Sequence, residues 1–155
     1  MTDTEKLAYK NKLKSWALDA IAKRINTGKE AMFQAQEAAN SEDKSSAGDK
    51  YETGRAMGHL QKEMHARQLA ESVKELTALQ AIATDFLSLD GRPGAILQGD
   101  ELAFFISAGL GKQIIEDRIV VFLSPQAPLA KLLQGKKPGD KIPFNNTIVS
   151  IREVF

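Results

Sequence analysis

Proline is confined to one part of this 155-residue chain, and its distribution constrains the fold more than any other feature. Residues 1 to about 88 contain no proline, whereas all five prolines occur from Pro93 onward. Proline inside a helix removes a backbone hydrogen bond and clashes with the preceding turn, so a proline-free stretch rich in Ala, Glu, Lys, Gln and Leu favours long helices. The later residues are rich in Ile, Val, Leu and Phe and are interrupted by Gly, Pro and Asn, a pattern typical of strands. The sequence therefore predicts a helical half followed by a mostly β half.

Two long helices are predicted, from about Asp3 to Ala39 and from about Asp49 to Phe86. The first carries an apolar seam at alternating three- and four-residue steps, as in a coiled coil: Leu18, Ile21, Ile25, Met32, Ala35 and Ala39. The second is expected to present Met57, Leu60 and Met64, continued after a phase slip by Leu69, Val73 and Leu76. The polar connection near residues 40–48 is short, so residues 1–89 are expected to form an antiparallel coiled-coil hairpin. About 36 residues per helix at 1.5 Å each give an arm on the order of 55 Å long.

Residues 90–155 predict a small domain of antiparallel strands with one short helix, which makes the fold class α+β. Asp90-Gly91-Arg92-Pro93-Gly94 is the linker, because Gly and Pro end any helix there. The strands are expected at 95–97, 102–106, 112–115, 119–123, 141–144 and 148–154, and the short helix at 128–134. Asn145-Asn146 tolerates the left-handed conformation of a tight hairpin turn between the last two strands.

Composition and missing motifs exclude several functions. The 21 Lys and Arg balance 20 Asp and Glu, which argues against a basic nucleic-acid-binding domain. The chain has no cysteine, so disulfides and a thiol nucleophile are excluded. It contains neither the roughly 20-residue apolar run of a membrane span nor the apolar core of a signal peptide, so a cytoplasmic protein is expected. P-loop, H-E-x-x-H and G-x-S-x-G motifs are also missing, and we do not expect an independent enzyme.

The polar connection between the helices contains the most informative acidic residues. Glu42 and Asp43 form an exposed pair of a kind that can hold Mg²⁺, which takes few protein carboxylates and keeps several waters. The alternative is a solvated loop whose acids lie beside a helix start. Asp49 stands three residues before Glu52, the spacing of a helix capping box, and is the weaker metal candidate.

Basic and aromatic residues have plain structural explanations beside functional ones. Four lysines at the start of the first helix could form a docking patch, but a solvated face is favoured: Lys6, Lys10, Lys12 and Lys14. Most phenylalanines are expected in the core, with a peptide-binding cleft as the alternative for some: Phe86, Phe104, Phe105, Phe122, Phe144 and Phe155. Trp16 is expected to pack at the base of the hairpin or on the second domain.

A signature in the second half accompanies the hairpin pattern. It reads Ser124-Pro125, then Pro128-Leu129 and Leu132, then Gly135-Lys136-Lys137 and Gly139-Asp140. A helical hairpin with an acidic tip, followed by an α+β domain with this signature, resembles the transcript-cleavage factor family GreA/GreB. The resemblance covers most of the chain in matching order.

The resemblance implies a partner and a mechanism. In that family the coiled coil enters the secondary channel of bacterial RNA polymerase, and two tip acids help hold a catalytic Mg²⁺ while the polymerase cuts backtracked RNA. The second domain is FKBP-like and docks at the channel rim. For this chain, the resemblance implies that Glu42 and Asp43 assist the polymerase and help bind its metal ion. It also implies partner contacts at the following residues: Lys44, Ser45, Ser46, Asp49, Ser124 and Pro125. It implies a monomer with no cofactor of its own, possible sharing of the polymerase's Mg²⁺, no membrane contact and only indirect contact with nascent RNA.

The tip departs from the family pattern, which reads Asp-x-x-Glu-Asn followed by a Tyr. Matching Asp43 to the first acid puts Ser46 at the second, and anchoring on Tyr51 puts Lys44 and Ala47 at the acidic positions. One alternative is therefore a channel-binding inhibitor without cleavage activity. The others are an FKBP-like peptide-binding protein or prolyl isomerase, and a structural module whose coiled coil dimerises.

Overall fold

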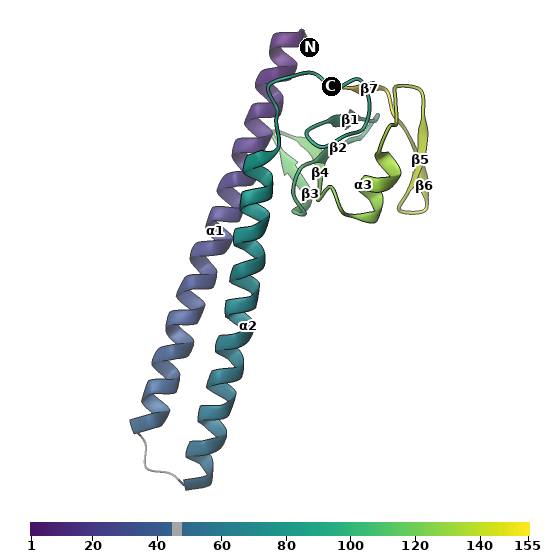
Figure 1. Cartoon of the computed structure of the whole chain (residues 1–155). Helices are drawn as coiled ribbons and strands as arrows, with labels where there is room; N and C mark the ends of the chain where they lie inside the picture. Colours follow the sequence, from purple (N-terminus) through teal and green to yellow (C-terminus); the bar gives the residue numbers. More distant parts are fainter. Residues whose placement is uncertain (45–47) are drawn as a thin grey trace. The chain divides into compact units, whose positions relative to one another are not determined.

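The structure is a computed structural model that describes the backbone of residues 1–44 and 48–155, and the side chains of residues 1–41, 53–54 and 56–155. Two long helices, α1 (Asp3–Lys44) and α2 (Gly48–Ala81), precede a β region with one short helix, α3 (Pro128–Leu133) (Figure 1). The chain divides into two compact units: residues 19–77, called the hairpin unit, and residues 1–18 with 78–155, called the sheet unit. The predicted α+β class is confirmed.

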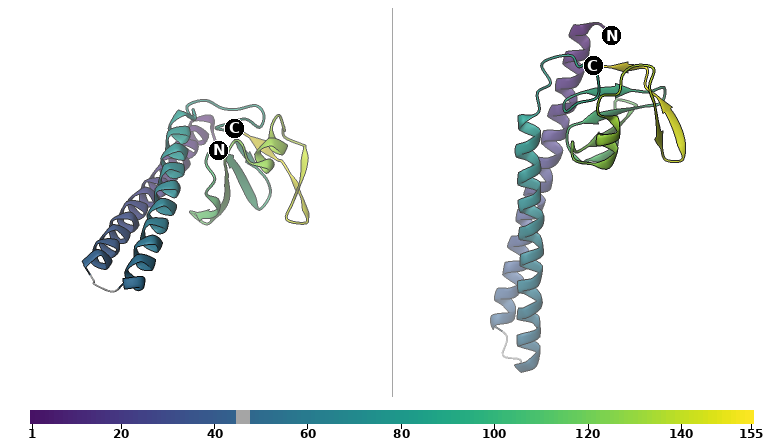
Figure 2. Two further views of the ribbon diagram at one scale, coloured as in Figure 1. Left: turned by 60° about the horizontal axis from the view of Figure 1, so that its bottom comes forward. Right: turned by 45° about the vertical axis from the view of Figure 1, so that its right-hand side comes forward.

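In the hairpin unit the two helices run side by side in opposite directions (Figure 2). A Cβ atom built at Gly28 would lie 3.7 Å from Leu69 Cδ1, and one at Gly58 would lie 3.2 Å from Ala39 Cβ. Both contacts belong to one constant antiparallel register. The glycines and alanines at the interface let the two helices approach closely.

The seam predicted on α1 is confirmed within this unit, and most of the seam predicted on α2 is wrong. On α1, Ile21, Ile25, Ala35 and Ala39 are buried. On α2, the expected seam residues are instead exposed, between 45% and 59%: Met57, Leu60, Met64 and Val73. The positions that face inward follow a heptad spacing through residues that are mostly small or polar: Gly58, His65, Leu69, Ser72 and Leu76. Apolarity alone therefore selected the wrong face of α2.

α1 begins at Asp3 as predicted, whereas both long helices end at residues other than those expected. A capping box fixes the start of α1, since Thr2 N donates to Glu5 Oε2 at 2.7 Å and Glu5 N donates to Thr2 Oγ1 at 3.2 Å. α1 continues to Lys44, five residues past Ala39, and α2 ends at Ala81 rather than Phe86. Lys14 Nζ donates to the carbonyls of Ile82 at 2.6 Å and Gln80 at 3.3 Å, so a side chain from α1 satisfies backbone acceptors at the end of α2.

The four lysines at the start of α1 form internal contacts, so the predicted solvated face is wrong for buried Lys10 and for half-buried Lys6 and Lys14, whereas Lys12 is exposed. Lys6 pairs with Glu153, and Lys12 pairs with Glu116. Lys10 is fully buried; its Nζ donates to the Phe86 carbonyl at 2.8 Å and lies 5.3 Å from the centre of the Phe86 ring.

Buried Lys10 should make stability depend on pH. Burial lowers the pKa of its ammonium from 10.5 to about 8, and Asp85 opposes that shift. Between pH 8 and 10.5 the unfolded chain binds more protons at this residue than the folded one, so this contribution to stability rises with pH. Urea unfolding of wild type and Lys10→Met should therefore differ by an amount that changes by about 2 kcal/mol across this window.

Exposed Lys23 on the same helix provides the matched control, as Lys23→Met. The wild type and this control should keep a nearly constant difference in unfolding free energy from pH 7 to 11. A Lys10→Met curve parallel to the wild-type curve over that range would contradict the assignment.

The sheet unit contains a five-stranded sheet of order β3-β4-β2-β1-β7 and a separate β5-β6 pair. The strands are β1 (Ile96–Gln98), β2 (Leu102–Ile106), β3 (Gly111–Ile115), β4 (Arg118–Leu123), β5 (Lys141–Phe144), β6 (Thr147–Ser150) and β7 (Glu153–Val154). Asn145 and Asn146 have φ of 49° and 63°, which confirms the predicted tight turn.

One strand pair corrects the expectation of purely antiparallel strands. β2 and β4 are parallel, with Phe104 opposite Val121 and Phe105 opposite Phe122. After β2 the chain crosses to the sheet edge as β3 and returns as β4, which fills the place next to β2. This order leaves the less buried β3 at the edge and puts the apolar β4 inside the sheet.

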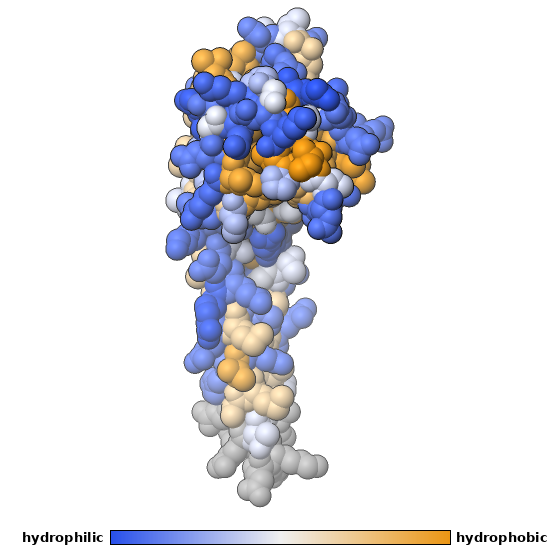
Figure 3. Space-filling view, turned by 90° about the vertical axis from the view of Figure 1, so that its right-hand side faces the viewer, coloured by the Kyte–Doolittle hydropathy of each residue, from blue (hydrophilic) through white to orange (hydrophobic). Residues whose placement is uncertain are grey.

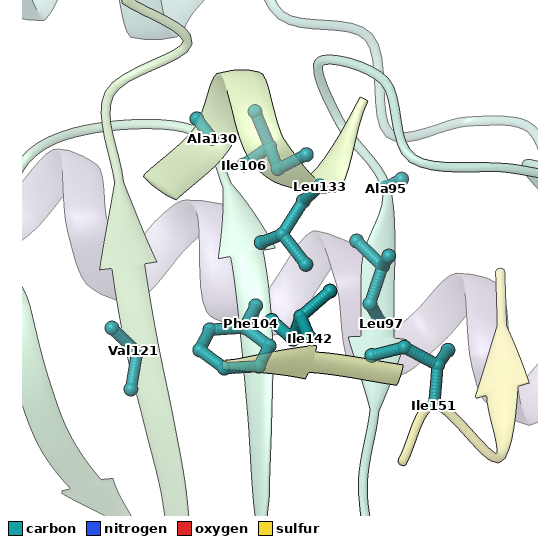
Figure 4. Packing of buried hydrophobic residues seen from close by; sticks show 9 residues of the cluster. All are labelled: Ala95, Leu97, Phe104, Ile106, Val121, Ala130, Leu133, Ile142 and Ile151. Carbon is teal, nitrogen blue, oxygen red and sulfur yellow. The ribbon is translucent and has the colours of Figure 1, made fainter. Parts of the chain in front are cut away.

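Both faces of the sheet are covered within this unit. On one face, Leu97, Phe104 and Val121 pack with Leu133 of α3 and with Ile142 and Ile151 (Figure 4). On the other face, Trp16 of α1 stacks on Phe122, with ring centres 5.2 Å apart. Four phenylalanines are at most 1% exposed, which confirms them as core: Phe104, Phe105, Phe122 and Phe155. These four are therefore not available to line an open peptide-binding cleft.

The surface is mixed in character. On the face drawn in Figure 3, hydrophilic residues flank the hairpin, and hydrophobic residues gather on part of the sheet unit. Exposed large apolar side chains of that unit include Leu89, Ile114 and Ile148, at 82%, 70% and 67% exposure. Among the described residues, no helix combines the length and apolarity needed to cross a bilayer.

Candidate functional site

The predicted tip residues lie at the C-terminal end of α1 and at the N-terminal end of α2. Glu42, Asp43 and Lys44 form the last residues of α1, and Asp49 is the second residue of α2. Ser45 and Ser46 lie outside the described residues. The acidic candidates thus come from two helix ends that are joined by a three-residue connection.

A second acidic pair lies at the start of α2. Asp49 and Glu52 have the Asp-x-x-Glu spacing of the family tip, which is also the spacing of a capping box. α2 begins at Gly48, so Asp49 lies inside the first turn rather than at the N-cap position. Positions three apart on a helix share a face, and acids in a first turn are favoured by the helix dipole. The signal that could have found the pair was the spacing itself.

Ser124 and Pro125 form a turn that leads into α3. The Ser124 hydroxyl donates to Gln126 Oε1 at 2.8 Å and accepts from Gln126 N at 3.3 Å. Ala127 N donates to the Ser124 carbonyl at 3.0 Å. This local structure explains the Ser-Pro pair by turn chemistry, and its contact with a partner stays a prediction.

The Gly-Lys-Lys-x-Gly-Asp segment also has local structural roles. Gly135 and Gly139 have φ of 76° and 97°, which favours glycine. Asp140 Oδ2 accepts a hydrogen bond from Lys137 N at 2.8 Å, which closes the turn before β5. The signature that carries the resemblance therefore specifies the backbone path from α3 into the β5-β6 pair.

The hairpin unit has an open groove of about 690 Å³ along its two helices. Gly28, Ala31 and Ser72 lie in it, and Arg24 Nη1 pairs with Glu75 Oε2 at 3.1 Å at one end. Small side chains at the helix interface explain the groove. His65 lines it, whereas His59 is exposed.

In the described part of the chain, no three His, Asp or Glu side chains are grouped so that they could hold a metal ion. Comparison with known proteins gave no significant match to any family model, curated protein or solved structure. The candidate site therefore consists of the acids at the joined ends of α1 and α2.

Proposed function

We propose that this protein is a Gre-like transcription factor that binds bacterial RNA polymerase through its secondary channel and modulates elongation. The observation that carries the proposal is the antiparallel α1–α2 hairpin with acids at its joined ends, followed in the chain by an α+β region with the Ser-Pro and Gly-Lys-Lys-x-Gly-Asp signature. The close helix contacts at Gly58 and Ala39 make the pair slender, as insertion into a channel requires.

The acids would act on the polymerase's own active site. Carboxylates are hard oxygen ligands that suit Mg²⁺, and a two-metal site for phosphoryl transfer gains from added carboxylates that retain its second ion. Asp49 and Glu52 are the first candidates because of their spacing, and Glu42 and Asp43 are the second. The chain itself is not proposed to be an enzyme, since the polymerase would supply the bond-breaking chemistry.

The test is a stalled, backtracked elongation complex mixed with the purified protein. Two quantities are measured separately: shortening of the RNA from its 3′ end, and binding to the polymerase. We expect both saturable binding and faster RNA cleavage. Binding without faster cleavage would leave a channel-binding modulator, and absence of binding even at low salt would overturn the proposal.

A further inference from the structure

The groove of the hairpin unit is not used by the proposed function, which assigns a role only to the acids at the helix ends. On the α1 side the groove is lined by Thr27, Gly28 and Ala31, whose side chains are small. Residues seven apart on a helix lie on the same face, so Ala38 continues this line of small residues beyond Ala31. One face of the hairpin unit is therefore hollow along α1.

Large apolar side chains stand on the α2 side of the same face. Gln68 and Glu71 line the groove, and Met64 precedes them by four and seven residues, so it belongs to this face. Leu60 and Met57 precede Met64 by the same two steps and continue the stripe. Met57 and Leu60 are both 59% exposed, and Met64 is 49% exposed. The face thus combines exposed bulk on α2 with small residues on α1.

The register of the hairpin places the bulk and the hollow at the same level. The two close approaches, of Gly28 to residue 69 and of Gly58 to residue 39, pair residues whose numbers add to 97. Met64 is therefore level with position 33 of α1, and Met57 is level with position 40. The stripe of α2 consequently lies beside positions 31–38, where α1 is hollow.

Charged residues on this face are divided between the helices as well. Arg24 lines the groove from α1, and Lys23 shares its face because it lies four residues before Thr27. Glu71 and Glu75 line the groove from α2, level with positions 26 and 22 of α1. At this end of the groove, α1 is therefore basic and α2 is acidic.

We propose that this face binds the same face of a second copy of the chain, in a parallel dimer whose two-fold axis follows the helices. Such an axis puts α2 of each copy on α1 of the other at the same level. Each apolar stripe then fills the hollow of the opposite copy, and each acidic pair faces a basic pair. A two-fold axis across the helices would instead leave the two hollow α1 surfaces facing each other.

The dimer goes beyond the proposed function and does not depend on it. The resemblance implies a monomer, and two packed hairpins are twice as thick as one. If both proposals hold, the polymerase channel would therefore admit the monomer, and the dimer would be a form in which this face of the hairpin is covered.

The size of the face sets the expected affinity. It is two helices wide, about 20 Å, and from residue 57 to residue 75 it is about 27 Å long at 1.5 Å per residue. The footprint of roughly 540 Å² per copy is smaller than the about 800 Å² per partner of a standard stable interface. We therefore expect a weak dimer, with a dissociation constant on the order of 10 to 100 μM.

The test is sedimentation equilibrium of the full-length chain at concentrations from about 5 to 500 μM, which bracket that dissociation constant. The average mass should rise with concentration from that of one chain toward that of two. Leu60→Gln/Met64→Gln changes exposed side chains, so folding is retained, and should raise the dissociation constant about tenfold or more. Phe33→Gln is the matched control. Phe33 is 67% exposed at the level of Met64, but it lies two residues from Ala31 and so on another face of α1, and its replacement should leave the dissociation constant unchanged.

Charge reversal tests the arrangement of the two copies. Lys23→Glu and Glu71→Lys should each raise the dissociation constant about threefold or more, because like charges then face each other at two places in the dimer. Both variants leave the ion pair between Arg24 and Glu75 intact. In an equimolar mixture of the two variants, opposite charges are restored at both places, so heterodimers should form about as tightly as the wild-type dimer.

Three results would overturn the proposal. The first is the mass of a single chain throughout the concentration range. The second is dimerisation that is unchanged by Leu60→Gln/Met64→Gln, or weakened equally by Phe33→Gln. The third is a mixture of the Lys23→Glu and Glu71→Lys variants that dimerises no better than either alone, which would contradict the parallel arrangement. These measurements contain no polymerase, so their failure is distinct from failure of the proposed function.

Discussion

Replacing Asp49 and Glu52 together with alanine is expected to slow stimulated cleavage of backtracked RNA by about 10- to 100-fold, the range typical when groups that support a metal site are removed. Binding of the polymerase should be nearly unchanged, because the remaining length of α1 and α2 is intact. Cleavage is measured as the rate of RNA shortening at saturating protein, and binding as competition with the labelled wild-type protein.

Glu42→Ala/Asp43→Ala is the companion variant, with the same loss of two charges. If Asp49 and Glu52 are the acting pair, this variant should reduce the cleavage rate by no more than about threefold. That is the effect expected from removing two exposed charges that do not bind the metal. The reverse pattern would assign the role to Glu42 and Asp43. Equal cleavage by both variants and wild type would contradict any role for these acids.

Gly91→Ala is expected to destabilise the sheet unit by about 3 kcal/mol or more, because overpacking a rigid site forces the backbone to move. The added Cβ would lie 1.9 Å from the Leu133 carbonyl oxygen at the end of α3. Gly91 also donates its N–H to the Lys136 carbonyl at 2.9 Å and accepts from Gly135 N at 2.8 Å, so it cannot shift without loss of these bonds. The midpoint of thermal unfolding should fall by roughly 10 °C for a chain of this size.

Gly28→Ala provides the control of opposite sign. Its Cβ would meet Leu69 at an ordinary contact distance of 3.7 Å. Alanine in a helix interior is favoured over glycine by about 1 kcal/mol, so this variant should be slightly stabilised. If the midpoint of thermal unfolding fell equally in both variants, the close approach at Gly91 would not be the cause of the destabilisation.

The sequence pattern predicted the elements of the fold well where local chemistry decides them. The proline-free half became two helices, and the Asn145-Asn146 turn and the helix beginning at Pro128 appeared where expected. The pattern failed where partners from distant parts of the chain decide. Lys14 satisfies acceptors at the end of α2, Lys10 is buried against Phe86, and β4 pairs in parallel with β2. None of these contacts has a signal in local periodicity.

The α2 seam shows why apolar spacing misled. Met57, Leu60 and Met64 follow helical steps, but they lie on the outer face of α2. Ala35 and Ala39 occupy the inner side of α1, where the partner helix needs small residues such as Gly58 to come close. Side-chain size therefore determines which face of α2 packs against α1, and a hydrophobicity pattern does not measure side-chain size.

The role of the acidic candidates stays a prediction. Registers anchored on Asp43 or Tyr51 do not include Asp49 and Glu52, whose three-residue spacing is also that of a capping box. The polar pocket lined by Tyr9, Asp100 and Asp117 could not be predicted, since it joins α1 to two turns that lie more than 80 residues further along the chain.

The sheet unit is discontinuous in sequence, because residues 1–18 belong to it together with residues 78–155. During synthesis its first segment leaves the ribosome long before its last, so Phe122 and Trp16 can pair only when most of the chain exists. Residues 19–77 form an insertion between the two segments of the sheet unit. Once α1 and α2 pair, the two ends of this insertion are held close together. Bringing residues 1–18 to residues 78–155 then costs much less loop-closure entropy. A fragment starting near residue 90 would lack the helical segment that covers one face of the sheet. Activity assigned to the C-terminal region should therefore be sought in the whole chain.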